Sequence, residues 1–236
     1  MMASMATKME RLISPLRAGD LDCPAGWPGG GLAARIPCLA EGHDAALEGL
    51  IARASLADPE GPDHPKRVGQ IAAILAEEFG LEEALRELLA RAAALHDIGK
   101  MALPEGVLGH RHVLDSDERR LMEQHTVLGA NILAHATVRW MRLAAVIALM
   151  HHERWDGSGY PLGLAGEEIP LAARLVAVAD VYDALRSDRP YKDAQDHGQA
   201  LSALLGGDSR IQPGQFDPRV LDALRRREAD IEAVPR

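Results

Sequence analysis

The sequence predicts an all-α protein, built as a bundle of several helices. Hydrophobic residues make up 47% of the 236 residues while aromatic residues make up only 3%. A core dominated by alanine and leucine favours helices over sheets. Apolar side chains also recur at helical spacing along most of the chain, and no segment has a convincing strand pattern.

Prolines and glycines delimit the first predicted helices. A short helix ends at Asp58-Pro59. Pro65 then stands in the first turn of the next helix, where a proline is tolerated, and Gly80 ends that helix. A third helix runs into His96-Asp97 and is predicted to stop near Gly99.

The helical pattern continues after a predicted loop over residues 101–115. The last helix has a clear start, because an aspartate that can cap it is followed by a proline at the first turn. The helices predicted after the loop begin at Asp115 or Ser116, span residues 141–152, begin at Ile169-Pro170, span residues 194–205 and begin at Asp217-Pro218.

Residues 1–42 differ from the rest of the chain. Their Pro/Gly cluster at 23–31 cannot form a helix interior, so we expect a poorly ordered arm or a short docking segment. Residues 43–236 form the predicted domain. Cys23 and Cys38 lie in the arm and could pair, but cysteines outside a core are more typical of the reduced thiols of a cytosolic protein.

Net charge and hydropathy exclude several classes of protein. The formal net charge is −9, which argues against binding a nucleic acid polymer, because phosphate contacts need clustered Lys and Arg. No apolar run reaches the length of a membrane span, and no continuous apolar segment near the start suggests a signal peptide. We therefore expect a cytoplasmic protein, and a homo-oligomer stays open.

Histidines and acids at helix ends form the candidate functional site. His151 and His152 close an apolar run, and a turn-rich segment follows them. A pair of surface histidines is the simpler interpretation of these two residues alone. Asp97, Asp180 and Asp183, however, fall beside apolar residues, and an unpaired buried carboxylate costs several kcal/mol. One metal site would satisfy the acids and the histidines together.

The donor types limit the metal. Imidazole nitrogen and carboxylate oxygen without cysteine suit iron, manganese, zinc or nickel rather than a structural thiolate zinc. The candidates are too many for one ion, so two or three bridged ions are predicted. Such clusters serve phosphoryl chemistry by activating water and stabilising the leaving oxygen.

Seven segments of the chain together resemble the HD-GYP domain, a bacterial subfamily of the HD superfamily of metal-dependent phosphohydrolases. The match covers roughly residues 43–226, and its motifs are long and ordered, so it is far more specific than a lone His-Asp pair. The matching segments are His64–Val68, Leu95–Lys100, Glu123–His125, His151–Pro161, Ala177–Leu185, Arg189–Lys192 and Phe216–Pro218.

The resemblance implies a multi-helix HD-domain bundle around a bi- or trinuclear metal site. The implied activity is hydrolysis of the second messenger cyclic di-GMP to the linear dinucleotide pGpG by a metal-bridged hydroxide, with a further cut to GMP left open. Two or three divalent ions are implied, with iron or manganese favoured over zinc or nickel. The implied ligands are Glu60, His64, His96, Asp97, His125, His151, His152 and Asp180.

The resemblance also implies catalytic and substrate-binding residues. Asp97 would bridge two metal ions, and Lys100 would face the scissile phosphate. Cations near the substrate are also sensible physically, because a bis-phosphate needs them in an acidic protein. The substrate contacts implied by the family are Tyr160, Asp183, Arg189 and Lys192.

Glu60 and the loop after Pro104 match the family pattern less closely than the other segments do. Glu60 precedes His64 by four residues, so on a helix the two would share a face and could hold a third ion. A loop acid before Pro62 is an equally good interpretation. Where the family often has Lys-Pro-Gly, this chain has residues 109–112, whose histidines we expect to face solvent.

Two other functions remain open on the sequence. A relative that has lost catalysis could bind a cyclic dinucleotide and signal by contact with a protein partner. An active enzyme could instead prefer another phosphoester; the intact segment 151–161 argues against mononucleotides but does not separate cyclic dinucleotides. Regulation is expected to come through residues 1–42 or a signalling partner, because no receiver or sensor domain is recognised.

Overall fold

The computed structural model describes residues 49, 52, 61–108, 115–134, 139–188 and 193–236. These residues form helices and connecting turns, and no strand occurs among them, which confirms the all-α prediction. The elements are α4 (His64–Glu77), α5 (Glu83–Ala93), η2 (Ile98–Ala102), α6 (Glu105–Leu108), α7 (Ser116–Ala134), α8 (Arg139–Met150), η3 (Gly166–Glu168), α9 (Leu171–Arg186), α10 (His197–Gly206), η4 (Pro213–Gln215), α11 (Pro218–Arg226) and α12 (Glu228–Glu232).

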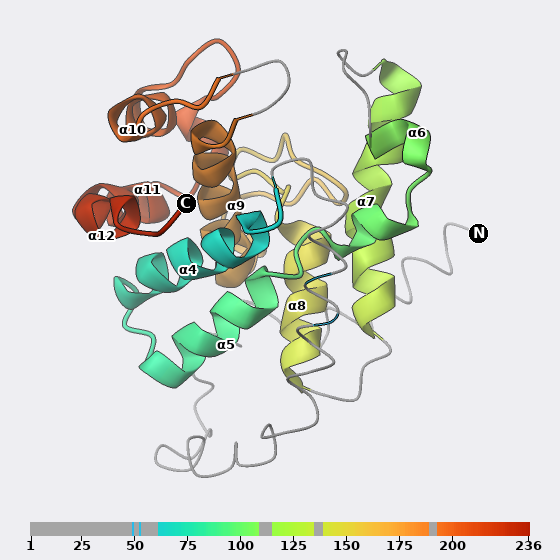
Figure 1. Cartoon of the computed structure of the whole chain (residues 1–236), viewed down its shortest axis with the longest axis horizontal. Coiled ribbons are helices and arrows are strands. Elements are labelled where there is room, and N and C mark those ends of the chain that lie inside the picture. Colours follow the sequence, from blue (N-terminus) through green and yellow to red (C-terminus); the bar gives the residue numbers. More distant parts are fainter. Residues whose placement is uncertain (1–48, 50–51, 53–60, 109–114, 135–138, 189–192) are drawn as a thin grey trace.

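Four helices surround the centre of the bundle. α4 packs along α5 and against α9, and α8 packs against α5, α7 and α9 (Figure 1). α10, α11 and α12 cover the far side of α9 and α4. The ends of α4, α5 and α8 and the middle of α9 therefore face one another, and this is where the predicted ligands lie.

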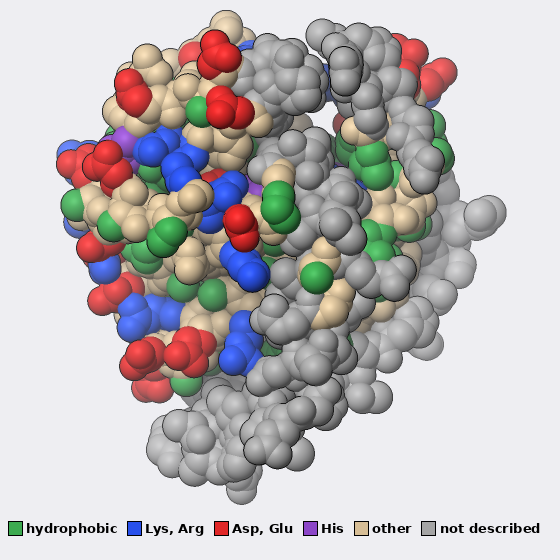
Figure 2. Space-filling model, in the orientation of Figure 1, with side chains coloured by type: hydrophobic (Ala, Val, Ile, Leu, Met, Phe, Trp, Pro, Cys, Tyr) green, Lys and Arg blue, Asp and Glu red, His purple; other side chains and the backbone are tan. Residues whose placement is uncertain are grey.

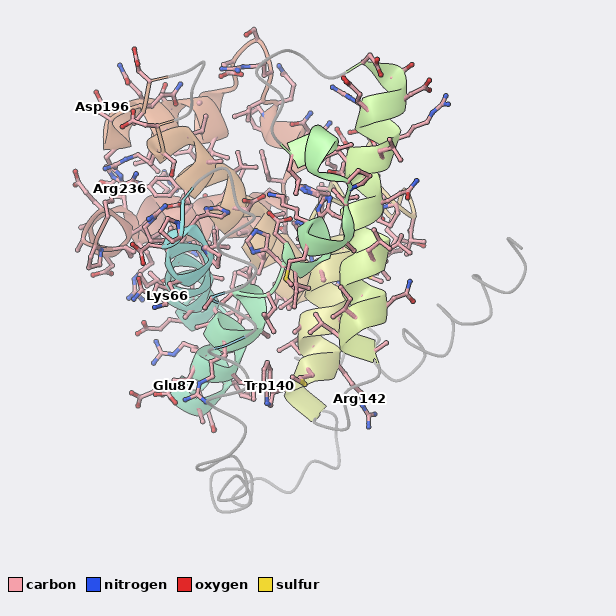
Figure 3. The ribbon with its side chains drawn as sticks, turned by 45° about the vertical axis from the view of Figure 1, so that its right-hand side comes forward. Lys66, Glu87, Trp140, Arg142, Asp196 and Arg236 are labelled. Atoms are coloured by element: carbon pink, nitrogen blue, oxygen red, sulfur yellow. The ribbon has the colours of Figure 1, made fainter. Side chains whose placement is uncertain are left out.

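One continuous apolar core joins these helices. It combines residues of α4, α5, α8 and α9 with residues of α10 and α11. Figure 3 shows Trp140 between α5 and α8, while Arg142 points away from the bundle. Trp140 is 6% exposed, so burial of this ring helps to hold α8 against α5.

Glycine allows two unusually close approaches between elements. A Cβ at Gly69 on α4 would lie 2.4 Å from the carbonyl oxygen of Ala90 on α5. A Cβ at Gly99 in η2 would lie 1.8 Å from the carbonyl oxygen of His125 on α7. Real Cβ atoms do not come this close, so only glycine permits these contacts.

The predicted boundaries hold in most places. Asp217 caps α11 by accepting a hydrogen bond from the backbone N–H of Arg219 (2.8 Å). The predicted loop over 101–115 was wrong in part, because it contains the short helix α6. The helix predicted over 194–205 begins later, since Asp196 and Gln199 form a capping box before α10.

Several predictions fall outside the described residues. They concern the arm 1–42 with its two cysteines, the helix ending at Asp58, the loop 109–112 and the residues Glu60, Arg189 and Lys192. Within the described part of the chain, no helix combines the length and the apolar character needed to cross a membrane. On the face shown in Figure 2, side chains of both charges are interspersed over α4, α5 and the C-terminal helices.

Candidate metal centre

Seven of the eight predicted ligands fall within the described residues, and each of these seven lies near the end of a helix or on its buried face. His64 is the first residue of α4. His96 and Asp97 lie in the turn between α5 and η2, and His151 and His152 lie in the turn directly after α8. His125 and Asp180 lie within helices, on the buried faces of α7 and α9. Packing of the ends of α4, α5 and α8 against the middle of α7 and α9 brings these seven residues together.

Asp97 is at the centre of this cluster. One carboxylate oxygen, Oδ2, lies 3.2 Å from Nε2 of His96, and the other, Oδ1, lies 3.1 Å from Nε2 of His125 and 3.6 Å from Nε2 of His151. The two oxygens therefore face different histidines, which is the arrangement needed to bridge two ions. Nζ of Lys100 lies 2.5 Å from Oδ2. Burial by itself raises the pKa of Asp97, but Lys100 and the histidines bring it well below its usual range.

Asp180 closes the other side of the cluster. Its Oδ1 lies 3.4 Å from Nε2 of His64 and 3.8 Å from Nε2 of His96. Although burial raises the pKa of this carboxyl, the adjacent imidazoles of His64 and His96 bring the pKa below its usual range. Asp180 is thus present as a carboxylate, the form that binds metal.

Three overlapping sets of side chains could each hold an ion. Within each set, one donor atom per residue lies within 4.8 Å of the others. Asp97, His96 and His151 each belong to two sets, so neighbouring ions would share ligands. The sets are Asp97, His125, His151 and His152; His64, His96 and Asp97; and His96, His151 and Asp180.

The burial and donor chemistry fit divalent metal ions. His96 is fully buried and Asp97 is 8% exposed. Nε2 of His96 and Oδ1 of Asp97 have close neighbours, but within the described residues they form no hydrogen bond of acceptable angle. Burial and the surrounding histidines lower the pKa of His151 and of His152, which keeps these rings neutral. A neutral imidazole is the form that binds metal.

The second ring nitrogen of three histidines is fixed by the backbone. Nδ1 of His96 donates to the carbonyl of Ala93 (2.9 Å), Nδ1 of His125 to that of Met122 (2.6 Å) and Nδ1 of His151 to that of Ile147 (3.0 Å). Each acceptor lies three or four residues earlier along the chain. These bonds direct Nε2 of each ring toward the cluster, as is common around metal ligands.

Tyr160 lies over the cluster. Its ring centroid is 4.8 Å from that of His152, and burial together with the charge of Asp97 raises the pKa of its phenol. The phenol is therefore neutral and can donate a hydrogen bond to a ligand. This placement is compatible with the predicted substrate contact.

Glu153 holds the segment that carries Tyr160. It is 3% exposed, and its two carboxylate oxygens accept hydrogen bonds from the backbone N–H groups of Leu162 (2.7 Å) and Leu164 (2.9 Å). The same segment is also held at Trp155, whose backbone N–H donates to the backbone carbonyl of Gln215 (2.8 Å). Glu153 was not predicted as a site residue, because its partners are backbone groups that no motif names.

The structure places Asp183 differently from the prediction. We expected a substrate contact, but this side chain is 0% exposed and lies behind His64, with Nδ1 of His64 2.7 Å from its Oδ2. Nε of Arg67 donates to Oδ1 at 2.7 Å, and Nη2 donates to Oδ2 at 2.9 Å. Burial raises the pKa of Asp183, but the hydrogen bonds from His64 and Arg67 bring it below its usual value. Both oxygens are therefore engaged within the protein. Arg67, one turn after His64, was not predicted as a site residue.

The described part of the chain is all-helical and gathers five histidines and two carboxylates at its centre. This arrangement is that of a metal-binding helical bundle. The family model described as "HD domain" matches residues 47–220, and the chain belongs to the HD domain family. This confirms the resemblance to the HD superfamily that the motifs indicated.

Curated relatives share the sequence over most of this chain. A "Cyclic di-GMP phosphodiesterase response regulator RpfG" from Xanthomonas campestris pv. campestris (strain 8004) is 46% identical over 169 residues, covering 72% of this chain and 44% of the relative. A "Cyclic di-GMP phosphodiesterase" from Thermotoga maritima is 39% identical over 190 residues, covering 80% of this chain and 50% of the relative. The chain thus spans half or less of the length of these relatives.

Solved structures support the fold. The structure titled "crystal structure of cyclic GMP-AMP specifc phosphodiesterases in V.cholerae (V-cGAP3)" aligns with a TM-score of 0.57 at 16% identity, covering 81% of this chain and 53% of that one. An "HDG"Y"P protein" of Bdellovibrio bacteriovorus, Bd1817, aligns with a TM-score of 0.54 at 21% identity, covering 69% of this chain and 50% of that one. At these identities the likeness concerns the fold alone.

Proposed function

We propose that this chain is a metal-dependent phosphodiesterase that hydrolyses cyclic di-GMP to pGpG. The observation that carries the proposal is the position of Asp97, whose two oxygens face different histidines while Lys100 approaches from the side. Relatives named cyclic di-GMP phosphodiesterases, at up to 46% identity, support the choice of substrate.

The buried cluster would hold two or three divalent ions, for which iron or manganese is favoured by the mixed nitrogen and oxygen donors. Such ions, when bound, supply activated water and positive charge at the reacting phosphate. The residues that would hold them are Glu60, His64, His96, Asp97, His125, His151, His152 and Asp180.

The residues of the chain have separate roles in the proposed reaction. Water oxygen bonds to phosphorus, the bond from phosphorus to the 3′ oxygen breaks, and that oxygen leaves with a proton; the product keeps its terminal phosphate on the 5′ side. Lys100 brings a positive charge next to Asp97 and would contact the phosphate. Tyr160, Arg189 and Lys192 would bind the rest of the dinucleotide.

A second substrate deserves direct comparison. A "3'3'-cGAMP-specific phosphodiesterase 2" from Vibrio cholerae is 38% identical over 161 residues, covering 68% of this chain and 30% of the relative. The metal centre handles the phosphodiester, which both cyclic dinucleotides share, so selection between them would depend on contacts to the bases.

We further propose that residues 43–236 form the HD-GYP domain and that residues 1–42 serve as an arm that docks a signalling partner. The activity is assigned to the cytoplasm, the compartment expected for cysteines kept as thiols. A chain that only binds the dinucleotide and signals by contact is the alternative that a turnover assay must exclude.

The test is turnover by anaerobically purified full chain with its metal content measured by elemental analysis. Cyclic di-GMP, 3'3'-cGAMP and cyclic di-AMP are offered side by side, and products are separated by chromatography. We expect pGpG from cyclic di-GMP, with Asp97→Ala losing both activity and bound metal. Asp222→Ala, at an exposed position of α11, is the matched control and should behave as the parent. A metal-loaded parent that binds cyclic di-GMP without cutting it would support the signalling alternative instead.

A further inference from the structure

His64 differs from the other histidines of the cluster in how its second ring nitrogen is held. His96, His125 and His151 each donate from Nδ1 to a backbone carbonyl three or four residues earlier. His64 is the first residue of α4, so no helical turn precedes it to offer such a carbonyl. Its Nδ1 instead lies 2.7 Å from Oδ2 of Asp183, 119 positions away on α9.

Asp183 is itself fixed in orientation. The guanidinium of Arg67 donates a hydrogen bond to each of its oxygens, at 2.7 and 2.9 Å, which sets the plane of the carboxylate. The hydroxyl of Ser187 also approaches Oδ2 at 3.4 Å. A carboxylate paired with arginine in this way only accepts hydrogen bonds. The hydrogen between His64 and Asp183 therefore belongs to Nδ1 of the ring.

We propose that Asp183, gripped by Arg67, is a positioning residue that fixes His64 as the Nδ1–H tautomer and turns its Nε2 toward the metal centre. Helix α9 thereby acts on both nitrogens of one ring, because Asp180, one turn before Asp183, lies 3.4 Å from Nε2. The proposal rests on the proposed function only in taking His64 as a metal ligand, and it deepens that function by assigning residues that set the site's affinity.

This role replaces the substrate contact that the sequence suggested for Asp183. The side chains of His64 and Asp183 are both fully buried, and the pair lies between the cluster on one side and Arg67 on the other. A substrate at the metal centre would meet the Nε2 side of His64, while Asp183 lies on the Nδ1 side. The effect of Asp183 would thus pass through His64.

The first measurement needs neither substrate nor metal. Long-range ¹H–¹⁵N correlation spectra of the chelator-treated full chain, with histidine labelled, report which ring nitrogen carries the hydrogen. We expect His64 to be the Nδ1–H tautomer in the parent. The signals of His64 are assigned as those that disappear in the spectrum of His64→Gln. Asp183→Ala should give a mixture of tautomers. Asp183→Asn should lie closer to the parent, since its amide oxygen can still accept from Nδ1.

The second measurement is the affinity of the full chain for Mn²⁺ without substrate, determined by calorimetry. Loss of an outer partner of a metal-binding histidine lowers affinity by roughly 10–100-fold. We expect a loss of this size in Asp183→Ala and a smaller one in Asp183→Asn. Arg67→Lys keeps the positive charge but lacks the two N–H donors that bind both oxygens of Asp183, so it should also weaken the binding of Mn²⁺. Asp222→Asn on α11 is the control for an exposed carboxylate and should bind as the parent does.

The outcomes separate this inference from the proposed function. If Asp183→Ala does not fold, Arg67→Lys decides instead, and parent-like Mn²⁺ affinity in that variant would overturn the positioning role. Parent-like tautomer and Mn²⁺ affinity in the Asp183 variants would overturn the positioning role, and a selective loss of cyclic di-GMP binding would then restore the substrate contact. If the parent binds Mn²⁺ but cuts no cyclic dinucleotide, the proposed function fails while the tautomer result still stands.

Discussion

Oε1 of Glu153 accepts a hydrogen bond from the backbone N–H of Leu162 at 2.7 Å, across nine positions of the chain. The other oxygen of the same carboxylate accepts from Leu164 at 2.9 Å. One buried side chain thus closes the segment that begins at the histidine pair and carries Tyr160. Glu153, which directly follows His152, thus fixes the loop that carries Tyr160 over the metal centre.

Glu153→Ala should loosen this loop without removing the metal ligands. Two backbone N–H groups would each lose a hydrogen bond to a carboxylate, and a hydrogen bond to a charged group contributes about 1.5–3 kcal/mol. We expect faster hydrogen exchange at residues 160–164, a raised KM for cyclic di-GMP and unchanged metal content. Glu87→Ala, at an exposed position of α5, is the control. Unchanged exchange at 160–164 would show that the loop is held by other contacts.

Gly99→Ala should disrupt the approach of η2 to α7. The added Cβ would meet the carbonyl oxygen of His125 at 1.8 Å and the backbone nitrogen of Gly129 at 2.5 Å, and backbone atoms cannot rotate away. Overpacking typically costs about 1–3 kcal/mol and occasionally more. We expect a destabilisation of at least that size in urea unfolding. Bound metal should also fall, because Asp97 directly precedes η2 and His125 lies on α7, the two elements that are forced apart.

Gly206→Ala is the matched control for Gly99→Ala. Gly206 is the last residue of α10, and a Cβ there would meet nothing within 4 Å. Its free energy of unfolding should stay within about 0.5 kcal/mol of the parent. Equal stability of the two variants would contradict the close approach of η2 to α7.

The sequence predicted the helical class, most helix boundaries and the ligand cluster, because these depend on local periodicity and on motifs with fixed spacing. It did not reveal the role of Asp183, since one aspartate on an apolar helix face looks the same whether it meets a substrate or a histidine from another helix. Glu153 was missed for a related reason: its partners are backbone amides. Arg67 could have been noticed, because it lies one turn after His64 on the same face of α4.

Arg189→Ala and Lys192→Ala should weaken substrate binding while leaving bound metal unchanged. A charge-assisted contact to phosphate contributes about 1.5–3 kcal/mol, so the Kd for cyclic di-GMP should rise about tenfold or more in each variant. The loss should shrink at high salt, because screening weakens the contact in the parent. Arg225→Ala, at an exposed position of α11, is the control. Parent-like binding in both variants would remove these residues from the proposed substrate clamp.

The number of metal ions depends on Glu60. Glu60 lies outside the described residues, so its role as a ligand stays a prediction. Among the described residues, α4 begins at His64, and Gly61 in the segment before it has a φ of +97°. A carboxylate there would add an oxygen donor to the set of His64, His96 and Asp97.

We predict that the parent binds three ions and that Glu60→Ala binds two. Two of the three ligand sets, Asp97 with His125, His151 and His152, and His96 with His151 and Asp180, lose no ligand in this variant. The core chemistry should therefore survive with a reduced rate. Anaerobic reconstitution followed by elemental analysis gives the number of ions per chain, and Glu87→Ala, on the exposed face of α5, is the control. An iron-filled cluster should in addition lose activity in air as ferrous ions oxidise. Two ions in the parent, unchanged in Glu60→Ala, would assign Glu60 to the loop and leave a binuclear centre built around Asp97.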